Sequence, residues 1–384
     1  MQTSPLKLTT SKVKMPETIS TVPVTPVRVA VIASGSGSEV EVSQRSAANV
    51  ADALLKRSYV VETFRFDGDL RRHLREFQPA LALPVAHGDG EDGSLQLLFE
   101  ELEIPYLGSG PESCALSWDK SRANAVVNEM LQSSAWSVSS GKDGLTACVP
   151  GFAEIGVGDS ALEQVNKFCR TLDPSAYLVS KPSKEGSSIG VEFFQHPANH
   201  LYSKAEVVMH LEGFDTGKAR LEAILGGVLR AQRLSGSALL QRAVQGNEIT
   251  VAVFEQDGVA RAFPVVEIST KKGTFYDFQN KYTVGASVHT IPARLPAEWL
   301  AHAQDVAIAI HRQLGCRDLS RVDFIVERQT ESSEPKCLCF LELNSLPGFT
   351  SQSTYPEAAA AAGISMDELL HTFVVQALNR AHRA

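Results

Sequence analysis

The sequence predicts an α/β protein of about two or three domains that begins with a doubly wound parallel sheet. Between residues 27 and 102, apolar strand-like runs alternate with segments of helical periodicity, which is typical of parallel strands joined by helices. Near the C-terminus, two apolar runs, Arg321–Glu327 and Cys337–Leu343, flank a polar loop and predict an antiparallel hairpin. The length of 384 residues and the hydrophobic content of 43% fit a globular chain with a sizeable core.

Composition and charge argue against several classes of protein. The net charge is −8 and the sequence pI is about 5.7, whereas nucleic-acid-binding domains are usually basic. No apolar run approaches the roughly 20 residues that a membrane span needs. The six cysteines are scattered and form no C-x-x-C pair, which argues against zinc and redox motifs and indicates free thiols in a reducing cytoplasm.

The N-terminal elements follow from these patterns. Residues 1–26 are rich in Ser, Thr, Pro and Lys and predict a disordered tail, and a transit peptide is disfavoured because the tail lacks Arg. The next 75 or so residues predict strands at 27–33, 59–66 and 80–86, and helices around 47–55, 69–77 and 94–102.

Ligands are expected in the two loops at the carboxyl ends of these strands, Gly35–Ser43 and His87–Gly93. The first loop is not a dinucleotide-binding G-x-G-x-x-G motif, because Val40 replaces the third glycine. No P-loop is present either, so any nucleotide must be held in another way.

The middle of the chain has features suited to phosphates. Asp119-Lys120 opens a predicted helix, and Leu178–Val191 consists of a strand, a loop rich in Gly and Ser, and the start of another strand. Such a loop can close over phosphates with its hydroxyl and N–H groups, and Lys181 supplies a point charge. An ordinary hairpin turn is the alternative.

The remaining segments lead to the C-terminal hairpin. Strands are expected at 239–244 and 246–253, and helices at 298–314 and 367–378. The aromatic-rich segment 273–282 shows no clear periodicity, and a packed surface loop with a solvated Lys281 is one interpretation of it.

The hairpin brings together a candidate metal site. Side chains two residues apart share one face of a strand, so Glu342 and Asn344 point the same way, and pairing of the two strands places Asp323 beside them. Three oxygen ligands without a nearby Cys or His suit Mg²⁺. A solvated hairpin with two edge carboxylates is the alternative.

Taken together and in order, the motifs of the chain from about Val27 onward resemble those of D-alanine–D-alanine ligases, members of the ATP-grasp superfamily. The matching segments are Glu41–Ser43, His87-Gly88, Gly90–Gly93, Asp119-Lys120, Lys181–Ser188, Gly246–Glu248, Phe275–Tyr282, Arg321–Asp323 and Glu342–Ser353.

The resemblance implies a three-domain ATP-grasp fold: a tail at 1–26, an N-terminal substrate domain at 27–110, a small central ATP-grasp domain at 111–240 and a C-terminal catalytic domain at 241–384. It implies ligation of two D-alanines through a D-alanyl phosphate for peptidoglycan precursors. ATP and two Mg²⁺ ions, or Mn²⁺, would be needed. It also implies a cytoplasmic homodimer with small-molecule substrates, no nucleic acid and no membrane span.

The resemblance also assigns roles to residues. ATP would lie between the central and C-terminal domains, with the α- and β-phosphates on Lys120 and Lys181, the ribose on Glu248 and the γ-phosphate near Lys281. Asp323, Glu342 and Asn344 would bind the two metal ions. Other nucleotide contacts would come from Glu185, Ser188, Gln241, Arg242 and Val244.

For the substrates, the resemblance places Glu41 at the ammonium group of the first D-alanine, with Ser187 and Tyr282 holding Glu41. Arg321 and the Gly348 N–H would form the oxyanion hole. The second D-alanine would meet His87, Ser353 and Thr354, with Ser353 holding its carboxylate.

Several positions depart from the family pattern. Gln241-Arg242 replaces a common Glu-Lys pair at the adenine strand, Thr354 replaces a Leu beside the second substrate, and Val40 replaces an Arg. The alternatives are therefore a related ligase that adds D-lactate, D-serine or another amino acid, and a degenerate ATP-binding protein. The intact acidic residues and lysines argue against the latter, and Tyr282, in place of Phe, favours a dipeptide product.

Overall fold

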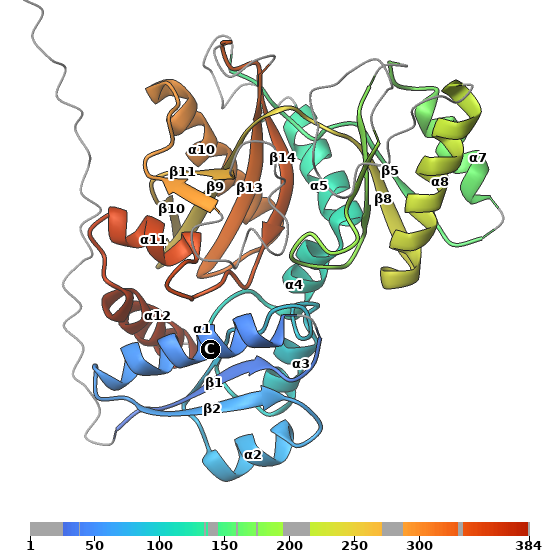
Figure 1. The fold of residues 1–384 in the computed structure, drawn as a ribbon. Coiled ribbons are helices and arrows are strands. Elements are labelled where there is room, and N and C mark those ends of the chain that lie inside the picture. Colours follow the sequence, from blue (N-terminus) through green and yellow to red (C-terminus); the bar gives the residue numbers. More distant parts are fainter. Residues whose placement is uncertain are drawn as a thin grey trace, which may run out of the picture.

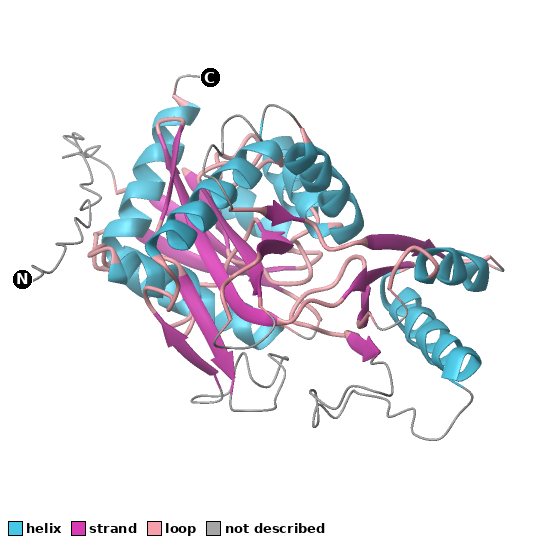
Figure 2. Ribbon diagram, turned by 90° about the horizontal axis from the view of Figure 1, so that it is seen from above, coloured by secondary structure: helices cyan, strands magenta, loops and turns pink. Residues whose placement is uncertain are grey.

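A computed structural model describes residues 26–37, 39–133, 136, 145–158, 160–173, 176–194, 216–270, 287–328 and 333–382. Within them, the chain forms three sheets of three, seven and four strands. In two perpendicular views, the domain that carries the four-stranded sheet extends to one side of the molecule (Figure 1, Figure 2). The mixture of a parallel sheet with antiparallel sheets agrees with the predicted α/β (α+β) class.

The N-terminal domain is the doubly wound unit that the sequence predicts. Its strands are parallel in the order β2-β1-β3. Side chains of the middle strand alternate between two cores: Val29 and Val31 enter one, and Ala30 and Ile32 the other, because successive strand residues point to opposite faces. The elements are β1 Arg28–Ser34, α1 Val40–Leu55, β2 Val60–Phe66, α2 Leu70–Phe77, β3 Leu81–Pro84 and α3 Ser94–Glu101.

The central domain is an antiparallel sheet in the order β5-β8-β6-β7. Two helices cover it, and they share a separate core with the strands. The elements are β5 Phe152–Gly156, α7 Ala161–Cys169, β6 Leu178–Pro182, β7 Glu192–Phe194, α8 Thr216–Ser235 and β8 Ser237–Arg242.

The C-terminal domain is built on the largest sheet, in the order β12-β11-β9-β13-β14-β4, with β10 paired to β9. Its strands are β4 Ala147–Cys148, β9 Gly246–Gln256, β10 Val259–Ala262, β11 Val266–Thr270, β12 Ser287–Thr290, β13 Leu319–Glu327 and β14 Cys337–Asn344. Its helices are α4 Pro111–Trp118, α5 Lys120–Gln132, α10 Ala297–Gln313, α11 Thr354–Ala361 and α12 Met366–Ala381.

Part of the segment before the central sheet packs on the C-terminal domain. Ala123 and Val127 of α5 and Val149 after β4 are buried in the same core as the strands of the large sheet. These three residues fall within the predicted central domain, 111–240, but they contribute to the C-terminal core.

No single helix in the described part of the chain is long and apolar enough to cross a membrane. Helices α11 and α12, which are bent by 101° to each other, pass a test of length and composition as a pair. Their side chains Tyr355 and Phe373 are fully buried in the protein core.

Candidate active site

A cavity of about 230 Å³ lies where the three domains meet, and it collects most of the predicted site residues. Those that line it are His87, Lys120, Lys181, Glu185, Ser187, Ser188, Gln241, Arg242, Val244, Glu248, Arg321, Asp323, Glu342, Asn344, Gly348, Ser353 and Thr354. Glu41 does not line it. Lys281 and Tyr282 lie outside the described residues.

The predicted hairpin is present, and its register brings the candidate metal ligands together. Asp323 on β13 lies directly opposite Glu342 on β14, and Arg321 lies opposite Asn344. Asp323 accepts hydrogen bonds from Arg321 Nη2 at 2.8 Å and from Thr250 Oγ1 at 2.5 Å. The three side chains offer only oxygen atoms on one wall of the cavity, and this donor set fits a hard divalent cation such as Mg²⁺.

Two lysines from other elements line the same cavity. Lys120 is the first residue of α5, and its Nζ lies 3.5 Å from Glu342 Oε2 and also donates to the backbone carbonyl of Glu185. Lys181 lies within β6 and is only 9% exposed. Positive charges held on an α-helix and a buried strand are fixed in place, as the binding of an anionic phosphate chain requires.

The carboxylate that the N-terminal domain contributes is Glu39, which corrects the assignment of Glu41. Glu39 is 5% exposed, lines the cavity and accepts a hydrogen bond from Ser187. Glu41 is exposed. Glu39 is the N-cap of α1 and Glu41 lies in the first helical turn, where a step of two residues is about 200° around the helix, so the two side chains point in opposite directions.

The Gly/Ser-rich loop packs directly on Glu39. A Cβ atom at Gly186 would collide with the Glu39 carboxylate, so only glycine permits this approach. Ser187 and Ser188 follow with φ values of 47° and 62°, a left-handed conformation that is uncommon for residues other than glycine. The loop is therefore held in a specific shape that aims the Ser187 hydroxyl at the carboxylate.

The strands that were predicted to hold the nucleotide also line the cavity. Gln241 in β8 is 1% exposed, and its Nε2 donates to the Pro150 carbonyl at 3.5 Å. Arg242 pairs with Glu327 at 2.8 Å. Glu248 in β9 lies opposite Ile325 of β13 and Ile268 of β11, both of which also line the cavity.

Two further titratable residues that line the cavity, His87 and Glu91, are buried. His87 is 5% exposed, and burial together with the Arg321 guanidinium lowers its pKa to about 4. Glu91 is 7% exposed and accepts from the Gly88 N–H at 2.6 Å. Burial, and after it the Glu39 carboxylate, raises the pKa of Glu91 well above its ordinary value. Because the pKa of His87 is about 4, its imidazole ring is uncharged at neutral pH.

The turn after β14 sets the last group of residues. A Cβ atom at Gly348 would lie 2.8 Å from Ser353 Oγ and 3.6 Å from His87 Nε2. The Ser353 hydroxyl accepts from the Thr350 N–H at 3.0 Å, and the two hydroxyls lie 2.8 Å apart. Ser353 is also the N-cap of α11, and Thr354 is its first residue, so both side chains lie at a helix N-terminus, which favours anions.

Sequence reasoning missed four residues of this site: Glu39, Glu91, Thr250 and Thr350. For Glu39 a signal existed, because it is the residue that precedes Val40 and ends the loop after the first strand. For Thr250 and Thr350 no signal was available in the sequence, since their roles arise from strand register and from a turn.

Comparisons with known proteins agree on one family. Residues 219–375 match the family described as D-ala D-ala ligase C-terminus. The D-alanine–D-alanine ligase of Halalkalibacterium halodurans is 32% identical over 361 residues, which is 92% of this chain and 100% of that protein. The corresponding ligase of an Anaeromyxobacter species is 34% identical over 344 residues, covering 89% of this chain and 94% of that protein.

Solved structures show the same fold at lower identity. The D-alanine–D-alanine ligase of Bacillus anthracis, crystallised with ATP, has a TM-score of 0.66 at 22% identity and covers 93% of this chain and 99% of its own. The VanG D-Ala:D-Ser ligase of Enterococcus faecalis has a TM-score of 0.66 at 24% identity, covering 92% of this chain and 100% of its own.

Proposed function

The chain belongs to the D-alanine–D-alanine ligase family, and from this premise we propose that it joins two D-alanines into D-alanyl-D-alanine for peptidoglycan precursors, using ATP. The observation that carries the proposal is the facing pair Asp323 and Glu342, with Lys120 Nζ 3.5 Å from Glu342, in one cavity. Carboxylates, a lysine and a cavity large enough for small molecules are what phosphoryl transfer to a carboxylate needs.

The first step transfers the γ-phosphoryl group of ATP to the carboxylate of the first D-alanine, which yields D-alanyl phosphate and ADP. Lys120 and Lys181 would neutralise the phosphates, and the base and ribose would contact Glu185, Ser188, Gln241, Arg242, Val244 and Glu248. Two Mg²⁺ or Mn²⁺ ions held by Asp323, Glu342 and Asn344 would supply further neutralisation of phosphate charge. Lys281 keeps its predicted role at the γ-phosphate.

In the second step, the amine of the second D-alanine attacks the acyl phosphate and releases inorganic phosphate. Glu39 would bind the ammonium group of the first D-alanine, supported by the hydrogen bond from Ser187. The supporting role predicted for Tyr282 toward Glu41 would pass to Glu39. Negative charge on the attacked carbonyl oxygen would be stabilised by Arg321 and the Gly348 N–H. Ser353, at the N-terminus of α11, is placed to hold the carboxylate of the second D-alanine.

The proposal is tested by phosphate release from ATP and Mg²⁺ with a panel of D- and L-amino acids, followed by mass spectrometry of the product. D-Alanine should give the highest kcat/KM and a dipeptide of two alanines. ATP turnover that needs no amino acid, or a clear preference for an L-amino acid, would contradict it. Binding of ATP without any turnover would assign the chain to the degenerate class.

One observation favours a second candidate, a ligase with a hydroxylated second substrate. Thr354 lines the cavity beside Ser353 and is 8% exposed, so a hydroxyl group faces the second subsite where the family has an apolar Leu. D-Serine as second substrate distinguishes the two: a mixed dipeptide formed from equimolar D-alanine and D-serine in excess of D-alanyl-D-alanine would support this candidate.

We also propose that the enzyme works as a homodimer in the cytoplasm, the arrangement that its family resemblance implies. Light scattering of the full chain gives the mass directly. A monomer at micromolar concentration would contradict the dimer.

A further inference from the structure

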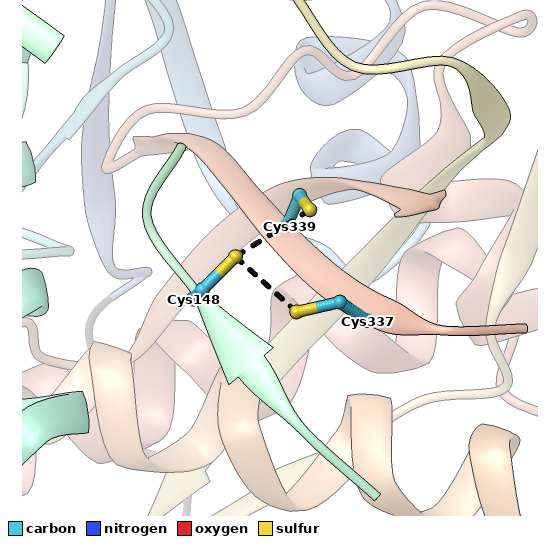
Figure 3. A group of neighbouring side chains, drawn as sticks. All are labelled: Cys148, Cys337 and Cys339. Carbon is cyan, nitrogen blue, oxygen red and sulfur yellow. Dashed lines mark hydrogen bonds between the residues drawn. The ribbon is translucent and has the colours of Figure 1, made fainter. Parts of the chain in front are cut away.

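Three of the free cysteines converge at one edge of the C-terminal sheet, on the edge strand β4 and its neighbour β14 (Figure 3). Cys148 Sγ lies 3.2 Å from Cys337 Sγ and 3.6 Å from Cys339 Sγ, and all three sulfurs lie within 4.8 Å of one another. The short strand β4 pairs in parallel with β14 and puts Cys148 opposite Cys339. Cys337 and Cys339 are two residues apart on β14, so both point toward Cys148.

The distances suit a shared ion better than a bond between two sulfurs. With metal–sulfur bonds of about 2.3 Å, two sulfurs on a tetrahedral zinc ion lie about 3.8 Å apart. The observed separations of 3.2 and 3.6 Å are a few tenths of an ångström shorter than that, whereas a disulfide needs about 2.05 Å. A disulfide joins only two sulfur atoms, whereas the Cys148 sulfur lies close to those of both Cys337 and Cys339.

The electrostatic surroundings favour a thiolate. The sulfur contacts with Cys148 and Cys339 lower the pKa of the Cys337 thiol to about 3, because they stabilise its thiolate, and the Arg242 guanidinium acts in the same direction. The contact with Cys337, and burial, raise the pKa of Cys148 to about 12 against the opposing effect of Cys339, and the contacts with Cys148 and Cys337 raise the pKa of Cys339. The cluster therefore favours a thiolate at Cys337, and a cation that binds must displace the protons that remain on the other thiols.

A cation can reach the three sulfur atoms, and a positively charged side chain lies near them. Cys148 and Cys337 are half-buried and Cys339 is buried, so a cation can reach the cluster from the edge of the sheet. Three thiolates around a divalent cation carry one net negative charge, and Arg242 is close enough to offset it.

We propose that Cys148, Cys337 and Cys339 form a binding site for one thiophilic cation of the Zn²⁺ or Cd²⁺ class. Binding forms three metal–sulfur bonds, and each thiol that is protonated releases its proton to the solvent as it becomes a thiolate ligand. The fourth tetrahedral position remains open to water. The site is separate in chemistry from the hairpin carboxylates, because thiolates select soft cations and carboxylates select Mg²⁺.

The test is a titration of the full-length chain with Cd²⁺ in a phosphine reductant, with excess Mg²⁺ to occupy oxygen ligands. The sulfur-to-cadmium charge-transfer band should saturate at about one equivalent and disappear when Zn²⁺ is added in excess. C337S should weaken Cd²⁺ binding by about tenfold or more, and C148S/C337S/C339S should abolish the stoichiometric band. The matched control C114S/C169S/C316S removes the other three cysteines and should keep the band. A band that survives in the first triple variant, or is lost in the second, overturns the proposal.

A second measurement uses the unaltered protein, so it does not depend on how the variants fold. Alkylation by iodoacetamide, quantified by mass spectrometry for each cysteine, should slow by about tenfold or more at Cys148 and Cys337 once Cd²⁺ is added. Cys169, which is also half-buried but lies on α7, should react at an unchanged rate. Equal protection of all three, or of none, overturns the proposal.

Discussion

Replacing Glu39 with Gln should raise the KM for D-alanine about a hundredfold and leave the KM for ATP nearly unchanged. Glu39 is 5% exposed and bonded to Ser187. A Gln amide oxygen can still accept that hydrogen bond, so the substitution removes mainly the charge that would face the substrate ammonium group.

The magnitude follows from the burial of the carboxylate. Removing one partner of a buried charge pair costs about 3–5 kcal/mol. Because the cavity also admits solvent, the lower end of this range of free energies applies. A loss of about 3 kcal/mol corresponds to roughly a hundredfold change in an equilibrium constant. The same substitution should bring the pKa of Glu91 down toward its ordinary value, since the Glu39 carboxylate contributes to raising it.

The assay is the initial rate of phosphate release against D-alanine concentration at saturating ATP, repeated against ATP at the highest D-alanine concentration. Glu41→Gln is the matched control: it makes the same change two residues away, at an exposed position outside the cavity, and should shift neither KM by more than about twofold. A large effect of Glu41→Gln with a small effect of Glu39→Gln would refute the assignment. A fall in ATP affinity in Glu39→Gln would place this carboxylate in the nucleotide site.

Three further substitutions test other parts of the cavity. Glu342→Gln should abolish phosphate release while the free energy of unfolding changes by less than about 1 kcal/mol, since its pair with Lys120 is partly exposed; activity that persists at ordinary Mg²⁺ would remove Glu342 from the site. Gln241→Glu should lower the KM for ATP by a few-fold to about tenfold, because a charged acceptor binds the adenine amino group more strongly, and should lower any use of GTP; unchanged values for both nucleotides would show that Gln241 does not face the base. For His87, burial and the Arg321 guanidinium lower the pKa from 6.5 to about 4 in the folded protein. The unfolded chain therefore binds the proton more readily than the folded protein. The free energy of unfolding is highest above about pH 6.5 and decreases as the pH falls toward 4. Wild type should therefore lose about 2 kcal/mol more than His87→Asn between about pH 7 and pH 5 in urea unfolding, and parallel curves for the two proteins would contradict the assigned pKa.

Much of the hairpin could be predicted because it depends on a local rule. Alternation along a strand places Glu342 and Asn344 on one face, and pairing across a short loop brings Asp323 opposite Glu342. The register shifts by one residue between Asp323 and Phe324, an irregularity with no sign in the sequence. It lies between the hairpin loop and the carboxylates: if the pairing of Phe324 with Phe340 continued without the shift, Asp323 would face Leu341, so the pairing of Asp323 with Glu342 depends on this irregularity.

Other features depend on long-range contacts, and the sequence could not provide them. The choice between Glu39 and Glu41 depends on the residue at which helix α1 begins, and helix boundaries are the least certain part of a sequence-based prediction. The cysteine cluster depends on β4, a strand of two residues whose parallel partner lies about 190 positions later. A C-x-C pair with a distant third cysteine has no motif by which to recognise it.

The described residues form four hydrophobic cores, and their distribution indicates which domains are packed together most firmly. Side chains of the N-terminal domain, such as Val31, share one core with Phe254 and Phe373 of the C-terminal domain, so separating these two domains would expose buried apolar surface. The central domain has its own core, and hinge motion about its connections breaks few apolar contacts.

We therefore expect that any opening of the cavity would move the central domain, which lies at the right of Figure 1, relative to the other two domains. Glu39, Asp323 and Glu342 stay fixed relative to one another, while Ser187 and Gln241 travel with the moving part. The hydrogen bond from Ser187 to Glu39 connects the central domain to the N-terminal domain, so such a movement would break it.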